Sequence, residues 1–167
     1  MRPISEGEIR ACFINCSKGE ATRLSLPRDF AELDWHDLDF LGWRDPAAPE
    51  RGYLVAERDA RLIGIALRTA SANARGFTAR SICTLCKTTR TGGGVALLTA
   101  RRAGESGRNG NTVGQYICSD LACSLYVRGK KTSAGSLLDE TLDQESKIER
   151  VNRGLDAFLS RIVQSGG

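Results

Sequence analysis

The sequence predicts an α+β fold, a small antiparallel sheet with flanking helices and a cysteine-rich finger, and three observations lead to it. Four of the six cysteines lie in two close pairs. Short apolar segments alternate with glycine-rich turns, which is typical of strands joined in hairpins. The last part of the chain repeats apolar residues at helical spacing. A length of 167 residues with 41% hydrophobic residues suits a single domain over 1–167.

The first half of the chain predicts one helix and one hairpin. Ser5 and Glu8 have the spacing of a capping box, and apolar side chains follow at helical intervals, so we expect a helix over about 6–17. Segments 52–58 and 61–69 are rich in apolar residues and predict two strands joined by an Asp-Ala turn. Because alanine at positive φ costs about 1 kcal/mol, we expect a turn other than type I′.

The second half predicts another hairpin and two helices. Strands over 95–102 and 112–118 flank the polar, glycine-rich segment 103–111, which we expect to be an exposed loop. Capping residues at its start and a glycine after its end predict a short helix over 120–128. Apolar residues recur at intervals of three and four over 142–163, so this segment predicts a longer, amphipathic C-terminal helix.

The two cysteine pairs predict a metal site. Their order is C-x2-C, thirty-one residues, then C-x4-C, with Cys83 and Cys86 in the first pair and Cys118 and Cys123 in the second. Zinc takes four thiolate or imidazole ligands at tetrahedral geometry. A treble-clef zinc finger has this order: a cysteine knuckle, then a hairpin, then a helix that carries the last ligands. We place such a finger over about 80–131.

Two other interpretations of the cysteines stay open at the level of sequence. A C-x-x-C pair can be a redox motif, but such a pair lies where a strand enters a helix of a βαβ unit, and this chain predicts no such unit there. Buried thiols without a metal are the second alternative. If zinc is bound, four cysteines close its coordination shell, so we expect one structural Zn2+ ion and no enzyme activity.

The remaining candidates favour no particular chemistry. Cys12 and Cys16 are expected to be buried apolar thiols, and His36, among acidic residues, is expected on a solvated surface. The GKKT segment at 129–132 lacks the upstream glycine of a phosphate-binding loop. The sequence shows neither an apolar signal-peptide core nor an apolar run that could span a membrane, so it predicts a cytoplasmic protein without a membrane partner.

Basic charge is concentrated in the middle of the chain. Residues 75–131 hold ten Lys and Arg against two acidic residues, whereas the whole chain has a net charge of +4. Arg80, Lys87 and Arg90 are close enough in sequence to the cysteines to offset the negative charge that four thiolates leave around one Zn2+ ion. The other charges predict a surface for an acidic partner, either a protein or a phosphate backbone. The candidate residues of this surface are Arg101, Arg102, Arg108, Asn109, Asn111, Lys130 and Lys131.

Several motifs resemble one known family. They are FLGWRDPAAPERGYLV, GIALR, ICTLCKTT and GNTVGQYICSDLACSLYVRGKK, followed by the closing helix. In these motifs the chain resembles the elongation factor G-binding, fusidic-acid-resistance type family, and specifically its C-terminal treble-clef zinc-finger domain. The resemblance implies that Cys83, Cys86, Cys118 and Cys123 are the zinc ligands, with Cys118 where resistance members have a histidine. Resistance members also carry a separate N-terminal helical bundle, which the resemblance does not cover.

The resemblance further implies a function. Resistance members bind elongation factor G and help it leave a drug-stalled ribosome, so we expect a cytoplasmic zinc protein whose partner is this factor, including factor on the ribosome. The alternative is an rRNA- or other nucleic-acid-binding zinc-finger module that uses the same basic surface. Tyr116 and Tyr126 are the only aromatic residues between 78 and 131, which is few for base stacking and favours the protein partner.

Overall fold

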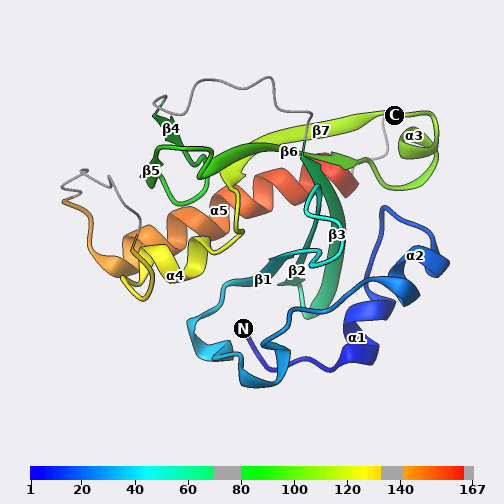
Figure 1. Cartoon of the computed structure of the whole chain (residues 1–167), viewed down its shortest axis with the longest axis horizontal. Coiled ribbons are helices and arrows are strands. Elements are labelled where there is room, and N and C mark those ends of the chain that lie inside the picture. The colour runs from blue at the N-terminus through cyan, green and yellow to red at the C-terminus, as the bar shows by residue number, and fades with distance from the viewer. Residues whose placement is uncertain (70–79, 133–140, 164–167) are drawn as a thin grey trace.

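A computed structural model describes residues 1–69, 80–132 and 141–163 of the chain, and Figure 1 shows the arrangement of its elements. In chain order, the elements are α1 (Glu6–Ala11), α2 (Lys18–Arg23), the 3-10 helices η1 (Phe30–Glu32) and η2 (Trp35–Asp37), β1 (Phe40–Arg44), β2 (Arg51–Arg58), β3 (Arg61–Thr69), β4 (Ser81–Ile82), β5 (Thr89–Arg90), β6 (Val95–Arg101), α3 (Gly104–Arg108), β7 (Thr112–Cys118), α4 (Cys123–Val127) and α5 (Gln144–Val163).

Five strands form one antiparallel sheet in the order β1-β2-β3-β6-β7, and β4 and β5 form a separate small sheet. The β2–β3 and β6–β7 hairpins each pair along the length of their strands. Among the described residues, the two hairpins pair with each other at Arg68↔Thr99 and Thr69↔Leu98. The four strands expected from the sequence are confirmed, and so is the α+β class with its small antiparallel sheet.

The sheet separates two hydrophobic clusters. Alternation along β2 shows the division, because Leu54 and Ala56 belong to one cluster while Tyr53 and Val55 belong to the other. The first cluster joins the sheet to the apolar stripe of α5 and contains the paired cysteines. The second joins β1 and β2 to the N-terminal segment with α1, which lies against the opposite face of the sheet (Figure 1).

The N-terminal half differs from the prediction in its helices and in one strand. The helix expected over 6–17 ends at Ala11, and Phe13 instead forms a bridge to Gly64 of β3. A second helix, α2, was not predicted and starts from a capping box of Ser17 and Glu20. Strand β1 was not predicted. Three of its five residues are buried, in the order buried, buried, intermediate, buried, intermediate, so it lacks the regular alternation that marks a half-exposed strand.

The turn between β2 and β3 also differs from the prediction. Asp59 and Ala60 both have positive φ, 47° and 60°, as a type I′ turn requires. The expectation of another turn type was wrong, because the backbone twist of this turn matches the twist of the strands and outweighs the strain of one alanine.

The segment between β6 and β7 is more ordered than the expected loop. It contains α3, in which Gly107 is buried against the backbone of Arg102, where a Cβ would overlap the Arg102 carbonyl oxygen.

The last two helices begin later than predicted. The finger helix α4 begins at Cys123 and not at 120, since Leu121 has a φ of 57° that no helix accommodates. The C-terminal helix begins at 144, two residues later than expected, and the Ser146 amide donates to the Asp143 side chain there, at 2.8 Å.

Candidate metal centre

The first cysteine pair lies in the tight turn between β4 and β5. The amide of Lys87 donates to the Cys83 carbonyl oxygen at 3.0 Å, and the amide of Cys83 donates to the Thr88 carbonyl oxygen at 3.1 Å. Lys87 takes a φ of 59° to close this turn. The Cys83 and Cys86 side chains therefore project to one side of a compact knuckle.

The second pair comes from the end of the β6–β7 hairpin. Cys118 is the last residue of β7 and Cys123 is the first residue of α4. The amide of Leu121 donates to the Cys118 carbonyl oxygen at 2.8 Å, which turns the chain back toward the knuckle. The hairpin and the helix thus supply one ligand each, the arrangement that the sequence predicted for a treble clef.

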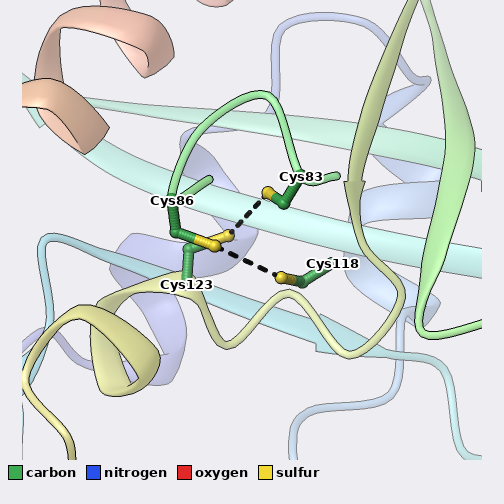
Figure 2. Close-up of side chains that lie close together, drawn as sticks. All are labelled: Cys83, Cys86, Cys118 and Cys123. Atoms are coloured by element: carbon green, nitrogen blue, oxygen red, sulfur yellow. Dashed lines mark hydrogen bonds between the residues drawn. The ribbon is translucent and has the colours of Figure 1, made fainter. Parts of the chain in front are cut away.

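The four sulfur atoms meet in one buried cluster, shown in Figure 2. The Sγ atoms lie within 4.8 Å of one another, with Cys83–Cys123 at 3.7 Å and Cys86–Cys118 at 3.5 Å. Tetrahedral zinc with Zn–S bonds of about 2.3 Å separates its sulfurs by about 3.8 Å. The cluster therefore fits one Zn2+ ion, and four thiolates from residues at most 3% exposed leave no open coordination position, so the site is structural.

The cysteines are free thiols whose environment favours deprotonation at two positions. Hydrogen bonds from Cys118, then Cys123 and Cys86, hold the pKa of Cys83 far below its ordinary value, and they outweigh the opposing effect of burial. Hydrogen bonds from Cys118 and then Cys123 also lower the pKa of Cys86, whereas the hydrogen bond with Cys118 helps to raise the pKa of Cys123. Thiolate is the form that binds zinc. The lowered pKa values of Cys83 and Cys86 suit metal ligands.

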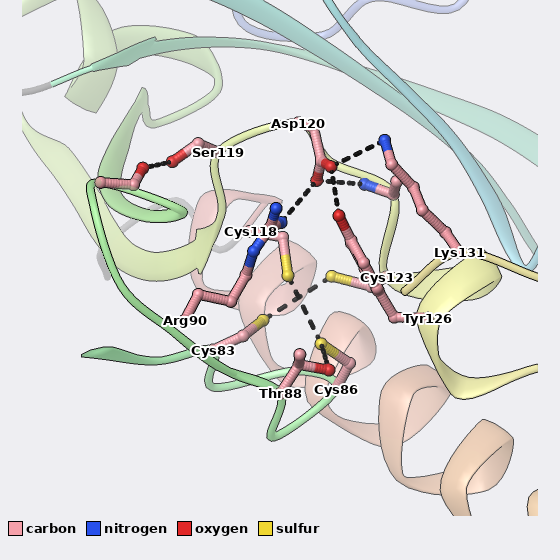
Figure 3. A network of polar contacts seen from close by, with 12 residues as sticks. Cys83, Cys86, Thr88, Arg90, Cys118, Ser119, Asp120, Cys123, Tyr126 and Lys131 are labelled. Atoms are coloured by element: carbon pink, nitrogen blue, oxygen red, sulfur yellow. Dashed lines mark hydrogen bonds and ion pairs between the residues drawn. The ribbon is translucent and has the colours of Figure 1, made fainter. Parts of the chain in front are cut away.

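A polar network stands beside the cluster, and Asp120 is its centre (Figure 3). Asp120 accepts from the Tyr126 hydroxyl at 2.7 Å and pairs with Lys131 at 2.9 Å and Arg90 at 3.3 Å. The Arg90 guanidinium also lies over the Tyr126 ring, 4.6 Å from its centroid. Burial acts to raise the pKa of Asp120, but hydrogen bonds from Tyr126 and Lys131 outweigh it and hold that pKa below its usual value. The network places Arg90 next to Cys118, where it can offset thiolate charge as expected.

The finger is fixed to the rest of the fold on two sides. On α5, Gly154 lets the helix approach Leu85 of the knuckle, and Arg150 donates to the Cys86 carbonyl oxygen at 3.0 Å. On the other side, Arg128 makes two hydrogen bonds with Asp39, at 2.6 and 2.8 Å. Both side chains of this pair are at most 12% exposed.

The candidate partner-binding residues fall into two separate groups. The hairpin-tip group consists of Arg101, Arg102, Arg108, Asn109 and Asn111 at the α3 end of the β6–β7 hairpin. The finger-side group consists of Lys130 and Lys131, next to the metal centre. Because β6 has seven residues, the groups lie about 20 Å apart along the hairpin. Lys130 and Lys131 are exposed but pair with Asp37 at 3.1 Å and Asp120 at 2.9 Å, so much of their charge is already matched.

Of the other candidates, His36 lies on the surface as predicted, whereas Cys12 and Cys16 are less buried than expected. Cys12 and Cys16 are half-buried, and burial raises the pKa of each thiol to about 11. His36 is exposed in η2. Asp120 and Tyr126 were missed by the sequence analysis, although the position of Asp120 between two cysteine ligands was a usable signal. Among the described residues, no helix combines the length and the apolar character needed to cross a membrane.

Comparison with known proteins supports the zinc finger. Residues 8–162 match the family model described as FBP C-terminal treble-clef zinc-finger. Among solved structures, the fusidic acid resistance protein FusC is similar to 84% of this chain, with 16% sequence identity and a TM-score of 0.49, and the chain covers only 52% of that protein. No curated protein matches the chain significantly. Because the family match covers nearly the whole chain and all four clustered cysteines, the chain belongs to the FBP C-terminal treble-clef zinc-finger family, as its sequence motifs predicted.

Proposed function

We propose that the chain is a cytoplasmic binding module for translation elongation factor G and that it promotes release of this factor from the ribosome. The observation that carries the proposal is the family match over residues 8–162, because the motifs in this region resemble elongation factor G-binding proteins. The metal centre supports binding rather than catalysis, since a closed shell of four buried cysteines leaves no position for a reacting water.

We place the main contact at the hairpin-tip group. Its backbone is held by hydrogen bonds, with the Asn109 amide donating to Glu105 at 2.9 Å and the Arg102 amide donating to Asn111 at 3.0 Å. The side chains of Arg101, Arg108, Asn109 and Asn111 are exposed on this rigid tip. A charged surface that needs no ordering on binding suits an acidic face of a protein partner. The finger-side group is a secondary contact, because Asp37 and Asp120 already match its charge.

Binding to rRNA is the weaker alternative. Stacking on exposed aromatic rings is the usual sequence-tolerant way to hold single-stranded bases. In the described part of the finger, Tyr126 is covered by Arg90 and hydrogen-bonded to Asp120, whereas Tyr116 is 42% exposed. One exposed ring is a poor stacking surface, so the structure favours a protein partner over RNA.

The direct test is co-elution of the purified chain with elongation factor G in gel filtration, after nuclease treatment of both proteins. We expect a complex that survives nuclease. Capture that nuclease abolishes would favour the RNA alternative, and two separate peaks at micromolar concentrations would overturn the proposal.

The contact surface is tested by the double variant Arg101→Glu/Arg108→Glu. Arg28→Glu/Arg61→Glu is the matched control, since both of its arginines are also exposed but lie outside the two groups. We expect the tip variant to weaken binding at least about tenfold at low salt and to flatten the salt dependence, while the control changes little. Equal affinity of the two variants would remove the hairpin tip from the interface.

The release step needs a separate assay. Elongation factor G is trapped on ribosomes with fusidic acid, the chain is added, and ribosomes are pelleted. We expect more factor in the supernatant with the wild-type chain than with the tip variant. Co-elution without release would keep the binding proposal and refute the release step.

A further inference from the structure

A pocket remote from the metal centre opens where α2 meets the ends of β2, β3 and β6. Its volume is about 210 Å³. The strand register brings its charges together, because Arg51 pairs with Arg68 across β2 and β3, and Arg68 pairs with Thr99 across β3 and β6. Arg23, the last residue of α2, and Arg101, the last residue of β6, also line it. Arginines from four separate elements therefore line one cavity, here called the arginine pocket.

Asn15 builds the wall of the arginine pocket between β3 and β6. The two strands stop pairing just before Ala66 and Arg101 would meet. The Asn15 side chain lies between them, with its amide nitrogen 3.0 Å from both the Ala66 and Arg101 carbonyl oxygens and its oxygen accepting from the Ala66 amide at 2.7 Å. A side chain thus replaces the missing backbone hydrogen bonds and holds the strand ends in place.

The carboxylates in the pocket wall already have structural partners. Asp45 accepts from the Tyr53 hydroxyl at 3.0 Å and from the Ala47 amide at 2.9 Å. Glu20 accepts from the Ser17 amide at 2.8 Å in the capping box of α2. In the part of the chain that the structure describes, three guanidinium groups of the pocket make no ion pair and donate no hydrogen bond, namely those of Arg23, Arg68 and Arg101.

The positive charge of this arrangement is only partly offset by Glu20, whose pKa is lowered first by hydrogen bonds from Ser17 and then by the charges of Arg101 and Arg68. Like charges directly opposite on neighbouring strands, such as Arg51 and Arg68, destabilise a sheet. Arg51 has a loose and exposed contact with Glu50, at 3.8 Å, and lies close enough to the Tyr53 hydroxyl to act on its pKa. Four arginines against Glu20 and Asp45 leave two positive charges in excess, which matches a phosphate monoester, with its charge of about −1.5 to −2 at neutral pH, better than a carboxylate.

We propose that the arginine pocket binds a small phosphate-bearing ligand through the guanidinium groups of Arg23, Arg68 and Arg101. The guanidinium fork donates two parallel hydrogen bonds to phosphate oxygens, and an anion here relieves the repulsion between Arg51 and Arg68. The volume of about 210 Å³ suits a phosphate or diphosphate group rather than a polymer. The pocket shares Arg101 with the hairpin-tip group, whereas Arg23 and Arg68 lie outside that group, so Arg68→Gln tests the pocket without changing the proposed elongation factor G contact.

Calorimetric titration of the full chain tests the site with three probes at constant ionic strength: inorganic phosphate, inorganic pyrophosphate and a nucleoside diphosphate. We expect saturable binding of one anion per chain. The key variant is Arg68→Gln, and Arg61→Gln at the other end of the same strand is the matched exposed control. Arg68→Gln should weaken binding at least about tenfold, or ~1.4 kcal/mol, while Arg61→Gln binds like the wild type.

Thermal melting separates loss of the ligand from loss of the fold. Phosphate should raise the melting temperature of the wild type and of Arg61→Gln, but not of Arg68→Gln. Without phosphate, Arg68→Gln should melt no lower than the wild type, because the substitution removes a like-charge pair. A diphosphate that binds as tightly as the nucleotide identifies the phosphate itself as the ligand, and a tighter nucleotide adds contacts to the nucleoside; both support the site. No saturable binding of any probe, or equal binding by Arg68→Gln, would overturn it.

Discussion

Replacing Cys123 with serine should unfold much of the protein and not only the finger. Cys123 is fully buried and belongs to the same hydrophobic cluster as Leu85, Ile117 and Phe158. Serine is a poor zinc ligand, so the variant loses most of its metal. Zinc contributes on the order of 10 kcal/mol in finger peptides, whereas a whole domain has about 5–15 kcal/mol of unfolding free energy. Loss of the metal term therefore removes most of the stability of the α5 side of the sheet.

The assay combines metal analysis with urea unfolding. Wild-type protein purified without added zinc should contain about one zinc per chain, and strong chelation should lower its urea midpoint as the serine variant does. Circular dichroism follows the helices, and α5 is the longest of them. Tryptophan fluorescence follows the opposite face of the sheet, because Trp35 and Trp43 both belong to the second hydrophobic cluster, which joins β1 and β2 to the N-terminal segment. Coincident midpoints would show that the metal stabilises both clusters together.

Cys12→Ala is the matched cysteine control. Cys12 is half-buried, and its thiol donates only to the Ile9 carbonyl oxygen, at 3.1 Å, so its loss should cost about 1 kcal/mol. If Cys123→Ser protein is free of zinc and still unfolds at the wild-type urea concentration, the metal is not structural. Wild-type protein with less than a few tenths of an equivalent of zinc and an intact fold would refute the metal site itself.

Three further predictions concern the scaffold. Arg128→Ala should destabilise the fold by about 3 kcal/mol in urea unfolding, because Asp39 stays buried without its partner; an effect below about 1 kcal/mol would show that water replaces the guanidinium. Ala60→Gly should raise stability by up to about 1 kcal/mol, since glycine tolerates a φ of 60°, and a lower melting temperature would contradict this. The Ser5 backbone amide lowers the pKa of Glu8 to about 2. The ionised Glu8 carboxylate therefore stabilises the fold above about pH 4.5, and this contribution is lost as pH falls toward 2. Glu8→Gln should remove that part of the acid dependence when stability is measured against pH.

Local patterns in the sequence determined a large part of this protein. The spacing of Cys83 and Cys86 requires a tight turn, and the alternation of apolar residues in the two hairpins reflects one buried face per strand. The capping box of Ser5 and Glu8 involves residues three apart. These features depend on neighbours along the chain, so they could be read before any tertiary contact was known.

Other features were decided by contacts between distant segments. Strand β1 could not be recognised in the sequence because both of its faces are covered, so its residues do not alternate. Helix α3 depends on the packing of Gly107 against the backbone of Arg102. Lys131 could be identified as basic, but only the fold places it on Asp120 and not beside the hairpin tip.

The two sites show the same division. The sequence by itself determined the metal site, because its ligands come as two local pairs whose residue type specifies the chemistry. Only the tertiary structure decided the arginine pocket, whose arginines come from four elements and whose wall depends on Asn15 reaching Arg101, 86 residues away. The physical reason is that a thiolate has few roles in a protein, whereas an arginine is defined by the charges around it, and the fold sets those charges.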